Sequence, residues 1–476
     1  MENTKKITWY TLAFMAFSTV WGFGNVLNGF VYFNGIQVIF SWILMFALYF
    51  VPYALMVGEL GSAFKPSGGG VSSWIHETIS PKFAYYAGWT YWACHVTYIA
   101  SKGSGGLKAL SWMFFQNGTT YDQFPTIWIQ LATLAALLFF CWVASRGLNP
   151  LKKLATIAGT SMFVMSILYI LMMFAAPAIN PNGGYVTMEF SKETLIPQFN
   201  LGYFTSLSIL VFAVGGCEKI SPYVNKVKDP SRGFPKGMIA LAIMVMVCAI
   251  LGTIAMGMMF DPAVINESSE SFNSYVSNGA YWSFQKLGEY YHVGNLLLII
   301  YAACNAIGQF STLVLSIDAP LRMLLDNEDA RQFVPTKLLK KNQHGAYING
   351  IFMVAGLSGS IILIQSFVPG AAAVLTQLNK LNSVTMPLRY LWVFVAYIAL
   401  RKAADKFHPE YRFVKNQGIA LTAGIWCFVV TAFCCIFGMY VEGDPASTAL
   451  NVITPFVLTA LGLILPIIKK NEKAAG

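Results

Sequence analysis

The sequence predicts an all-α membrane protein with twelve transmembrane helices. The chain has 476 residues, of which 56% are hydrophobic and only 11% are charged, whereas about a quarter of the residues of soluble proteins are charged. Apolar runs of about 20 residues, the length that crosses a bilayer, recur along the whole chain. Lysine and arginine gather in alternate loops between these runs, which is typical of a polytopic membrane protein.

The predicted spans are, in order, residues 8–33, 37–62, 83–113, 126–145, 151–176, 203–228, 235–260, 294–325, 346–366, 372–400, 414–439 and 447–468. They form a single transmembrane domain, 1–468, followed by a short tail, 469–476, with no soluble domain. An even number of spans puts both termini on one side. Of the 31 lysines and arginines, only Lys192 and Lys286 fall in segments on the other side, so the positive-inside rule predicts cytoplasmic termini.

Composition also excludes several kinds of partner. The net charge of +10 is spread over many loops instead of one patch, so we expect the lipid bilayer and no nucleic acid as a partner. The eight cysteines lie inside apolar runs and the five histidines are scattered, so neither disulfides nor a metal site is expected. No cofactor is predicted.

Two of the predicted spans are interrupted. The first is broken at Trp21-Gly22-Phe23-Gly24-Asn25, and the sixth at Gly215-Gly216, directly before Glu218 and Lys219. Because hydrocarbon offers the backbone no hydrogen-bond partners, breaks and charges are tolerated only where they line a cavity within the protein. Two interrupted helices in corresponding halves of a chain indicate a secondary transporter.

If the broken spans correspond, the chain contains two five-helix halves of opposite topology, as in inverted repeats. The first repeat covers about 8–176 and the second about 203–400, and about 414–468 forms two accessory helices. This repeat is inferred from the positions of the breaks.

The two breaks together predict a site for the two ends of an amino acid. Amides freed from Gly22 to Asn25 at a helix start favour a carboxylate, and carbonyls left unpaired on both sides of the breaks suit an ammonium group. The alternative is that the glycines only allow close helix packing. The predicted substrate-binding residues are Thr19, Val20, Gly22, Phe23, Gly24, Asn25, Lys102, Phe212, Ala213, Val214, Gly215 and Tyr301.

Charged residues within other spans extend this prediction. Lys102 and Lys108 are six residues apart, so at about 100° per residue they point in different directions and at most one should face the centre. Lys102 is the better candidate, because Lys108 lies near the helix end and can reach the interface. Lys380 and Arg389 are nine residues apart and should lie on opposite faces of their helix, so again at most one of them should face the centre. A cation facing the site would favour an anionic substrate or replace a coupling ion, whereas a structural cation would pair with a carboxylate.

Glu218 is the candidate for proton coupling. A carboxyl group just past the second break that binds and releases a proton would link protonation to the state of the broken helix. The alternative is that a permanently paired Glu218 braces the helix bundle.

Several motifs resemble those of the amino acid-polyamine-organocation superfamily, and the likeness covers most of the chain. Besides the first break, they are Pro52, Gly58-Glu59-Leu60, Pro66-Ser67-Gly68-Gly69-Gly70, Phe212-Ala213-Val214-Gly215-Gly216-Cys217-Glu218 and Lys228-Asp229-Pro230-Ser231-Arg232. Within the superfamily the chain resembles the glutamate/GABA antiporter group, particularly its YjeM-like bacterial members. Its first break reads Trp-Gly-Phe-Gly-Asn in place of the commoner Gly-Ser-Gly-Ile.

The resemblance implies a five-plus-five inverted repeat of the leucine-transporter type and a central site between spans 1, 3, 6, 8 and 10. It also implies a bacterial plasma-membrane protein, not an enzyme, that moves an amino acid or its amine derivative by alternating access. Coupling would be by exchange or proton symport, with sodium symport as the alternative. A channel or an intramembrane enzyme is not expected, because no filter repeat or catalytic cluster is present at membrane depth. The oligomeric state, monomer or homodimer, stays open.

Overall fold

The computed structural model describes residues 6–327, 330–367, 370–403 and 405–475. In these residues the regular structure is helical, apart from two isolated β-bridges, Ile7 with Val227 and Lys341 with Tyr347. Residues 1–5 at the start of the chain and residue 476 of the predicted tail lie outside the described part. The predicted all-α class is confirmed for the residues described.

In chain order the helices are α1 (Trp9–Val20), α2 (Phe23–Tyr32), α3 (Val38–Met45), α4 (Val51–Ala63), α5 (Val71–Thr78), α6 (Pro81–Phe115), α7 (Thr119–Gln123), α8 (Thr126–Ser145), α9 (Leu148–Ile179), α10 (Lys192–Leu195), α11 (Leu201–Val214), the 3₁₀ segment η3 (Cys217–Lys226), α12 (Pro230–Gly257), α13 (Pro262–Ile265), α14 (Ser269–Tyr290), α15 (Leu296–Leu325), α16 (Ala330–Phe333), α17 (Ile348–Gln365), α18 (Ala371–Leu388), α19 (Leu391–Lys402), α20 (Gln417–Gly438), α21 (Pro445–Ala460) and α22 (Ile464–Ala475).

Among the described residues, ten helical segments are long and apolar enough to cross a membrane. Each coincides with one of the predicted spans. The two remaining predicted spans are the first, which is divided into α1 and α2, and the third, which is the 35-residue helix α6. The total of twelve spans and the inverted repeat stay predictions.

Both predicted breaks are present. In the first, Trp21 and Gly22 have extended backbone, and helix resumes at Phe23. The break is therefore narrower than the sequence suggested, because Phe23, Gly24 and Asn25 already form the first turn of α2.

The second break depends on its two glycines for different reasons. A Cβ atom on Gly215 would lie 2.2 Å from the ring of Tyr390, so only glycine allows this packing. Gly216 has a φ of 103°, a left-handed conformation that side chains strongly disfavour. After these two residues the chain continues as η3.

Two features were not predicted. The tenth predicted span is divided at Arg389 and Tyr390, between α18 and α19. The segment expected to be the loop before span 8 contains α14, a 22-residue helix that packs on α15, α2 and α9. Its sequence, SESFNSYVSNGAYWSFQKLGEY, is too polar to show the apolar run of a membrane helix.

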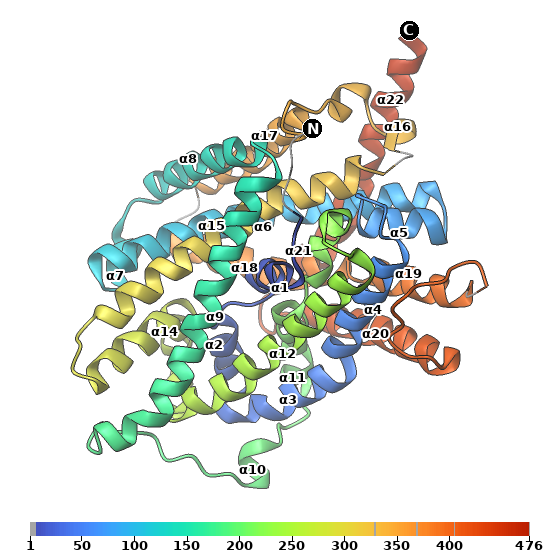
Figure 1. The fold of residues 1–476 in the computed structure, drawn as a ribbon. Helices are drawn as coiled ribbons and strands as arrows, with labels where there is room; N and C mark the ends of the chain where they lie inside the picture. The colour runs from blue at the N-terminus through green and yellow to red at the C-terminus, as the bar shows by residue number, and fades with distance from the viewer. Residues whose placement is uncertain (1–5, 328–329, 368–369, 404, 476) are drawn as a thin grey trace.

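The long helices α6 and α15 pack antiparallel along their length. A Cβ on Gly88 would lie 2.6 Å from the carbonyl oxygen of Met323, and one on Gly106 would lie 2.4 Å from the ring of Phe310. Small residues at these positions therefore allow the two helices to approach closely, as is common in membrane bundles. In Figure 1, α1 lies at the centre of the surrounding helices.

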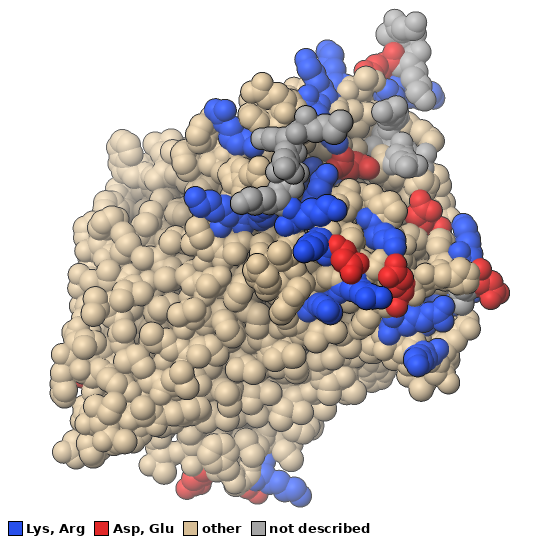
Figure 2. Space-filling view, viewed as in Figure 1, with Lys and Arg blue, Asp and Glu red and all other residues tan. Residues whose placement is uncertain are grey.

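The molecule has two distinct sides. In Figure 1, α5, α16 and α22 lie at one side, and α7 and α10 lie at the other. Lysine and arginine side chains gather on the side of α22, whereas the visible surface between the two sides carries almost no charge (Figure 2). We name these sides inner and outer after the orientation that the positive-inside rule predicts.

One test of the packing concerns Gly159 on α9, where a Cβ would lie 1.9 Å from the carbonyl oxygen of Phe14 on α1. Gly159→Ala should destabilise the protein by about 1–3 kcal/mol, the usual cost of overpacking, and lower its melting temperature in detergent. Gly356→Ala on α17 is the matched control, since nothing lies within 4 Å of its Cβ position. A Gly159→Ala protein that melts with the wild type would contradict this packing.

Candidate functional site

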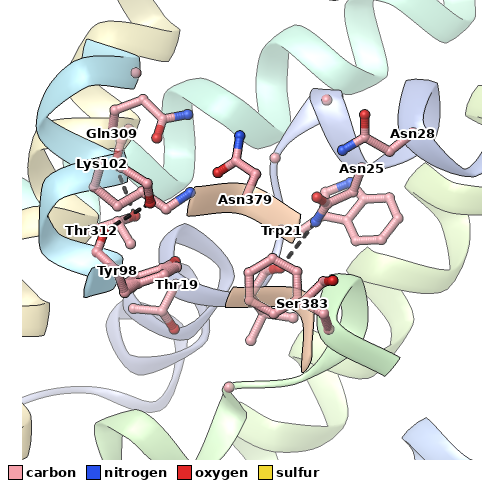
Figure 3. Close-up of a pocket in the computed structure, with 18 of the residues that line it drawn as sticks. Thr19, Trp21, Asn25, Asn28, Tyr98, Lys102, Gln309, Thr312, Asn379 and Ser383 are labelled. Atoms are coloured by element: carbon pink, nitrogen blue, oxygen red, sulfur yellow. Dashed lines mark hydrogen bonds between the residues drawn. The ribbon is translucent and has the colours of Figure 1, made fainter. Parts of the chain in front are cut away.

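A cavity of about 290 Å³ lies between the two broken helices, and α6, α14, α15 and α18 complete its walls (Figure 3). The predicted site residues that line it are Thr19, Val20, Gly22, Gly24, Asn25, Lys102, Phe212, Gly215 and Tyr301. Those that do not line it are Phe23, Ala213, Val214 and Glu218. Phe23 points away because its ring packs against Tyr169, Phe284 and Tyr301.

The start of α2 faces open space in this cavity. The first backbone N–H groups of a helix have no partner within it, and here the amide of Asn25 turns back to the carbonyl oxygen of Gly22 at 2.9 Å. A Cβ atom placed on Gly24 would meet nothing within 4 Å. The helix N-terminus can therefore receive an anion without steric obstruction.

The side chain of Asn25 joins the two breaks. Its Nδ2 donates hydrogen bonds to the carbonyl oxygen of Val20, at 3.3 Å, and to that of Ala213, at 3.1 Å. Two of the carbonyls that the sequence assigned to an ammonium group thus already accept a hydrogen bond. The sequence analysis considered the backbone of Asn25 and missed this role of its side chain.

Five cations from the predicted spans line the cavity: Lys102, Lys108, Lys219, Lys380 and Arg389. No aspartate or glutamate occurs among the lining residues in the part of the chain that the structure describes. The cavity wall therefore carries a large excess of positive charge.

The expectation that only one cation of each pair faces the centre is wrong. Lys102 and Lys108 both reach the cavity because it extends along α6 as far as α14, where the Lys108 ammonium donates to the hydroxyl of Ser277. Lys380 and Arg389 both line it as well, although Arg389 directly follows α18 with helical dihedral angles. The direction of a residue on its helix therefore did not decide which of these long side chains reach the cavity.

The cations differ in depth. Lys380 is exposed and Lys102 is partly buried, whereas only 2% of Lys219 and 3% of Arg389 are exposed. Lys102 and Lys219 lie over the same ring, that of Tyr98, at 5.0 and 5.1 Å from its centre. The cavity thus has an open part near α18 and a buried floor near the second break.

Glu218 lies behind this floor and is completely buried. Its Oε2 accepts a hydrogen bond from the hydroxyl of Tyr53, and its Oε1 lies 3.6 Å from Nη2 of Arg389. These contacts join α4, η3 and the junction between α18 and α19.

Several contacts close the inner side of the cavity. The amide of Ile7 donates to Lys226 at 2.9 Å, and the amide of Lys228 donates to Ile7 at 2.8 Å, so the segment before α1 is paired with the end of η3. The hydroxyl of Tyr223 donates to Asp318 on α15 at 2.7 Å. On the outer side, the exposed Lys380 and residues of α14 line the cavity.

Uncharged polar side chains complete the lining, and the sequence analysis did not find them. Figure 3 shows Asn28, Gln309, Asn379 and Ser383 around the open space, together with Thr312, whose hydroxyl donates to the carbonyl oxygen of Ser18 at 2.8 Å. Carboxamide side chains at membrane depth are costly unless they face a partner or a cavity. The positions of Asn28 and Gln309 within apolar runs could therefore have identified them as residues that line the cavity.

The family model described as amino acid permease matches residues 7–464 of this sequence. The chain belongs to the amino acid permease family. It is a transporter protein of the membrane and not an enzyme.

The relatives agree with this family. The aspartate/glutamate permease AcaP of Lactococcus lactis is 46% identical to this permease, over 99% of this chain and 97% of its own. The inner membrane transporter YjeM of Escherichia coli is 23% identical, over 98% and 96%. The glutamate/gamma-aminobutyrate antiporter of Lactococcus lactis is 24% identical, over 91% and 84%. The suspected resemblance is confirmed, although AcaP is more similar to this permease than YjeM is.

Gly24→Leu should abolish substrate binding by the permease and leave its folding intact, because the new side chain would fill the space in front of the α2 amides. Binding can be followed as the rise in melting temperature when amino acids are added. Gly356→Leu, on an exposed and unobstructed face of α17, is the control for adding the same side chain. Wild-type affinity in a folded Gly24→Leu protein would exclude the predicted carboxylate position.

Proposed function

We propose that this permease carries an acidic amino acid, aspartate or glutamate, across the bacterial plasma membrane. The observation that carries the proposal is the set of five cations around the cavity, with no carboxylate among the described lining residues. Such a wall attracts anions and repels amines, so it favours acidic amino acids over their decarboxylated derivatives. The relative named aspartate/glutamate permease, at 46% identity, supports the same substrates.

In this proposal each end of the substrate has its own partner. The α-carboxylate binds at the start of α2, in front of Gly22 and Gly24, where free amides and the helix dipole favour a negative charge. The ammonium group binds at backbone carbonyls of the two breaks, around Thr19 and Gly215. The second carboxylate lies among the cations, and Phe212 and Tyr301 supply apolar wall.

Transport follows from alternating access around this site. The chain would have twelve spans, with a five-plus-five inverted repeat of the leucine-transporter type and both termini in the cytoplasm. The present arrangement is then open to the outside and closed to the inside. Reaching the inward-open arrangement requires η3 to leave α15, which breaks the hydrogen bond between Tyr223 and Asp318.

The substrate class can be tested directly with purified protein in proteoliposomes. Uptake of labelled aspartate should be inhibited by excess glutamate, and much less by asparagine, glutamine or γ-aminobutyrate. Replacing sodium with choline should leave uptake unchanged if transport is by exchange or proton symport. Equal inhibition by asparagine and glutamate would contradict an acidic substrate, and a requirement for sodium would establish the rival coupling.

Lys102→Ala should narrow the preference for acidic over neutral amino acids, because Lys102 is a partly buried cation of the cavity wall, next to Gln309 and Thr312 (Figure 3). We expect a loss of about tenfold in the preference, the effect of about 1.4 kcal/mol. Lys192→Ala, which removes an exposed cation of α10, controls for general attraction of anions to the outer side. An unaltered substrate ranking in Lys102→Ala would give Lys102 a structural role.

Glu218 remains the candidate for proton coupling. Protonation of Glu218 would remove the negative charge that faces Arg389, so Arg389 would attract an anion in the cavity more strongly. By linkage, an anion bound in the cavity would favour protonation of Glu218. Glu218→Gln fixes the uncharged form, so transport should continue with a flattened dependence on pH. If the variant transports with the pH dependence of the wild type, Glu218 is a brace and not the switch.

A further inference from the structure

The floor of the cavity contains a cluster of three buried charges, Glu218, Lys219 and Arg389, which we name the floor cluster. Glu218 and Lys219 begin η3, directly after the second break, and Arg389 lies between α18 and α19. Lys219 and Arg389 line the cavity, whereas Glu218 lies behind them. All three are at least 97% buried.

Lys219 has no carboxylate as a partner among the described residues. Its ammonium donates to the hydroxyl of Ser316 at 2.6 Å and lies 5.1 Å from the centre of the Tyr98 ring. Asp318, on the same helix as Ser316, is already bonded to Tyr223 and Arg322, at 2.7 and 2.6 Å. The charge of Lys219 is therefore not balanced by an ion pair.

Arg389 is only partly satisfied. Its Nη2 lies 3.6 Å from Glu218, its Nη1 lies 2.9 and 3.0 Å from Nδ1 and Nε2 of His95, and its buried Nε has no hydrogen-bond partner. Nδ1 of His95 also lies 2.5 Å from the carbonyl oxygen of Tyr91. We count the buried imidazole as neutral, because a second cation in contact with the guanidinium would be strongly unfavourable.

The floor cluster thus holds one positive charge in excess. A buried charge without a counter-charge is strongly unfavourable, and an anion placed against Lys219 and Arg389 would remove this cost. Lys102 and Lys380 are less suited to this task, because water reaches them and screens their charge. Lys108 is buried as well, but it lies toward the outer end of α6, bonded to Ser277.

We propose that the floor cluster is the subsite for the side-chain carboxylate of the substrate, with Lys219 as its main ligand. Glu218 limits the excess to one charge, so that a single carboxylate neutralises the floor and an uncharged carboxamide leaves it uncompensated. Lys219 then contributes most to distinguishing aspartate and glutamate from asparagine and glutamine. This inference rests on the proposed acidic substrate.

The test measures dissociation constants for aspartate and asparagine, together with melting temperature, on purified full-length variants. Lys219→Met removes the excess charge and should weaken aspartate binding on the order of 10- to 100-fold, the effect of losing one charge-assisted contact. Asparagine binding should change little. Without ligand, the variant should melt no lower than the wild type, because an uncompensated buried charge is gone.

Two further variants separate charge from shape. Adding Glu218→Gln to Lys219→Met returns one excess charge, carried by Arg389, and should restore at least part of the preference for aspartate. Glu218→Gln alone raises the excess and should strengthen aspartate relative to asparagine. If Lys219→Met does not fold, Glu218→Gln alone tests the charge balance of the floor cluster.

The outcomes are distinct. If the wild type itself binds asparagine as well as aspartate, the proposed function fails. If the wild type prefers aspartate and folded Lys219→Met keeps that preference, the function stands and the floor cluster is not the subsite. If Glu218→Gln prefers aspartate over asparagine no more strongly than the wild type does, the proposed charge balance is contradicted and the floor cluster is again not the subsite.

Discussion

The backbone of a helix that breaks inside a membrane must find its hydrogen bonds within the protein, and the rest of this structure depends on that constraint. At Trp21 and Gly22 and again at Gly215 and Gly216 the helical hydrogen bonds end. The carboxamide of Asn25 satisfies a carbonyl from each break and so fixes the two broken helices together. The groups that remain free face the cavity, which makes the breaks a binding surface.

Charge is the second constraint, and its strength depends on depth. Two unit charges 4 Å apart interact by about 1 kcal/mol in water and about 4 kcal/mol at an effective dielectric constant of 20. In the proposed function, the cations at the open part of the cavity therefore act mainly by attracting and orienting an anion. The buried cations near the second break would contribute more to selectivity, because little water screens them.

The sequence was sufficient for features that the bilayer imposes directly. Ten spans and both breaks followed from apolar runs and glycines, because these patterns are local. Features that depend on tertiary contacts were missed. The polar helix α14 is held by packing on its neighbours, and the direction of a residue on its helix did not decide which cationic side chains reach the cavity. For the site, the sequence located the backbone breaks but placed Phe23 in the cavity, although neighbouring aromatic rings hold it elsewhere.

The central claim is that one acidic amino acid binds between the broken helices with its two carboxylates on different partners. A structure of the protein determined with bound aspartate tests this most directly. The account predicts one carboxylate at the amides of α2, in front of Gly24, and the other within hydrogen-bonding distance of a lysine or arginine of the cavity. Aspartate bound outside the cavity, or with its side-chain carboxylate away from every one of these cations, would contradict it.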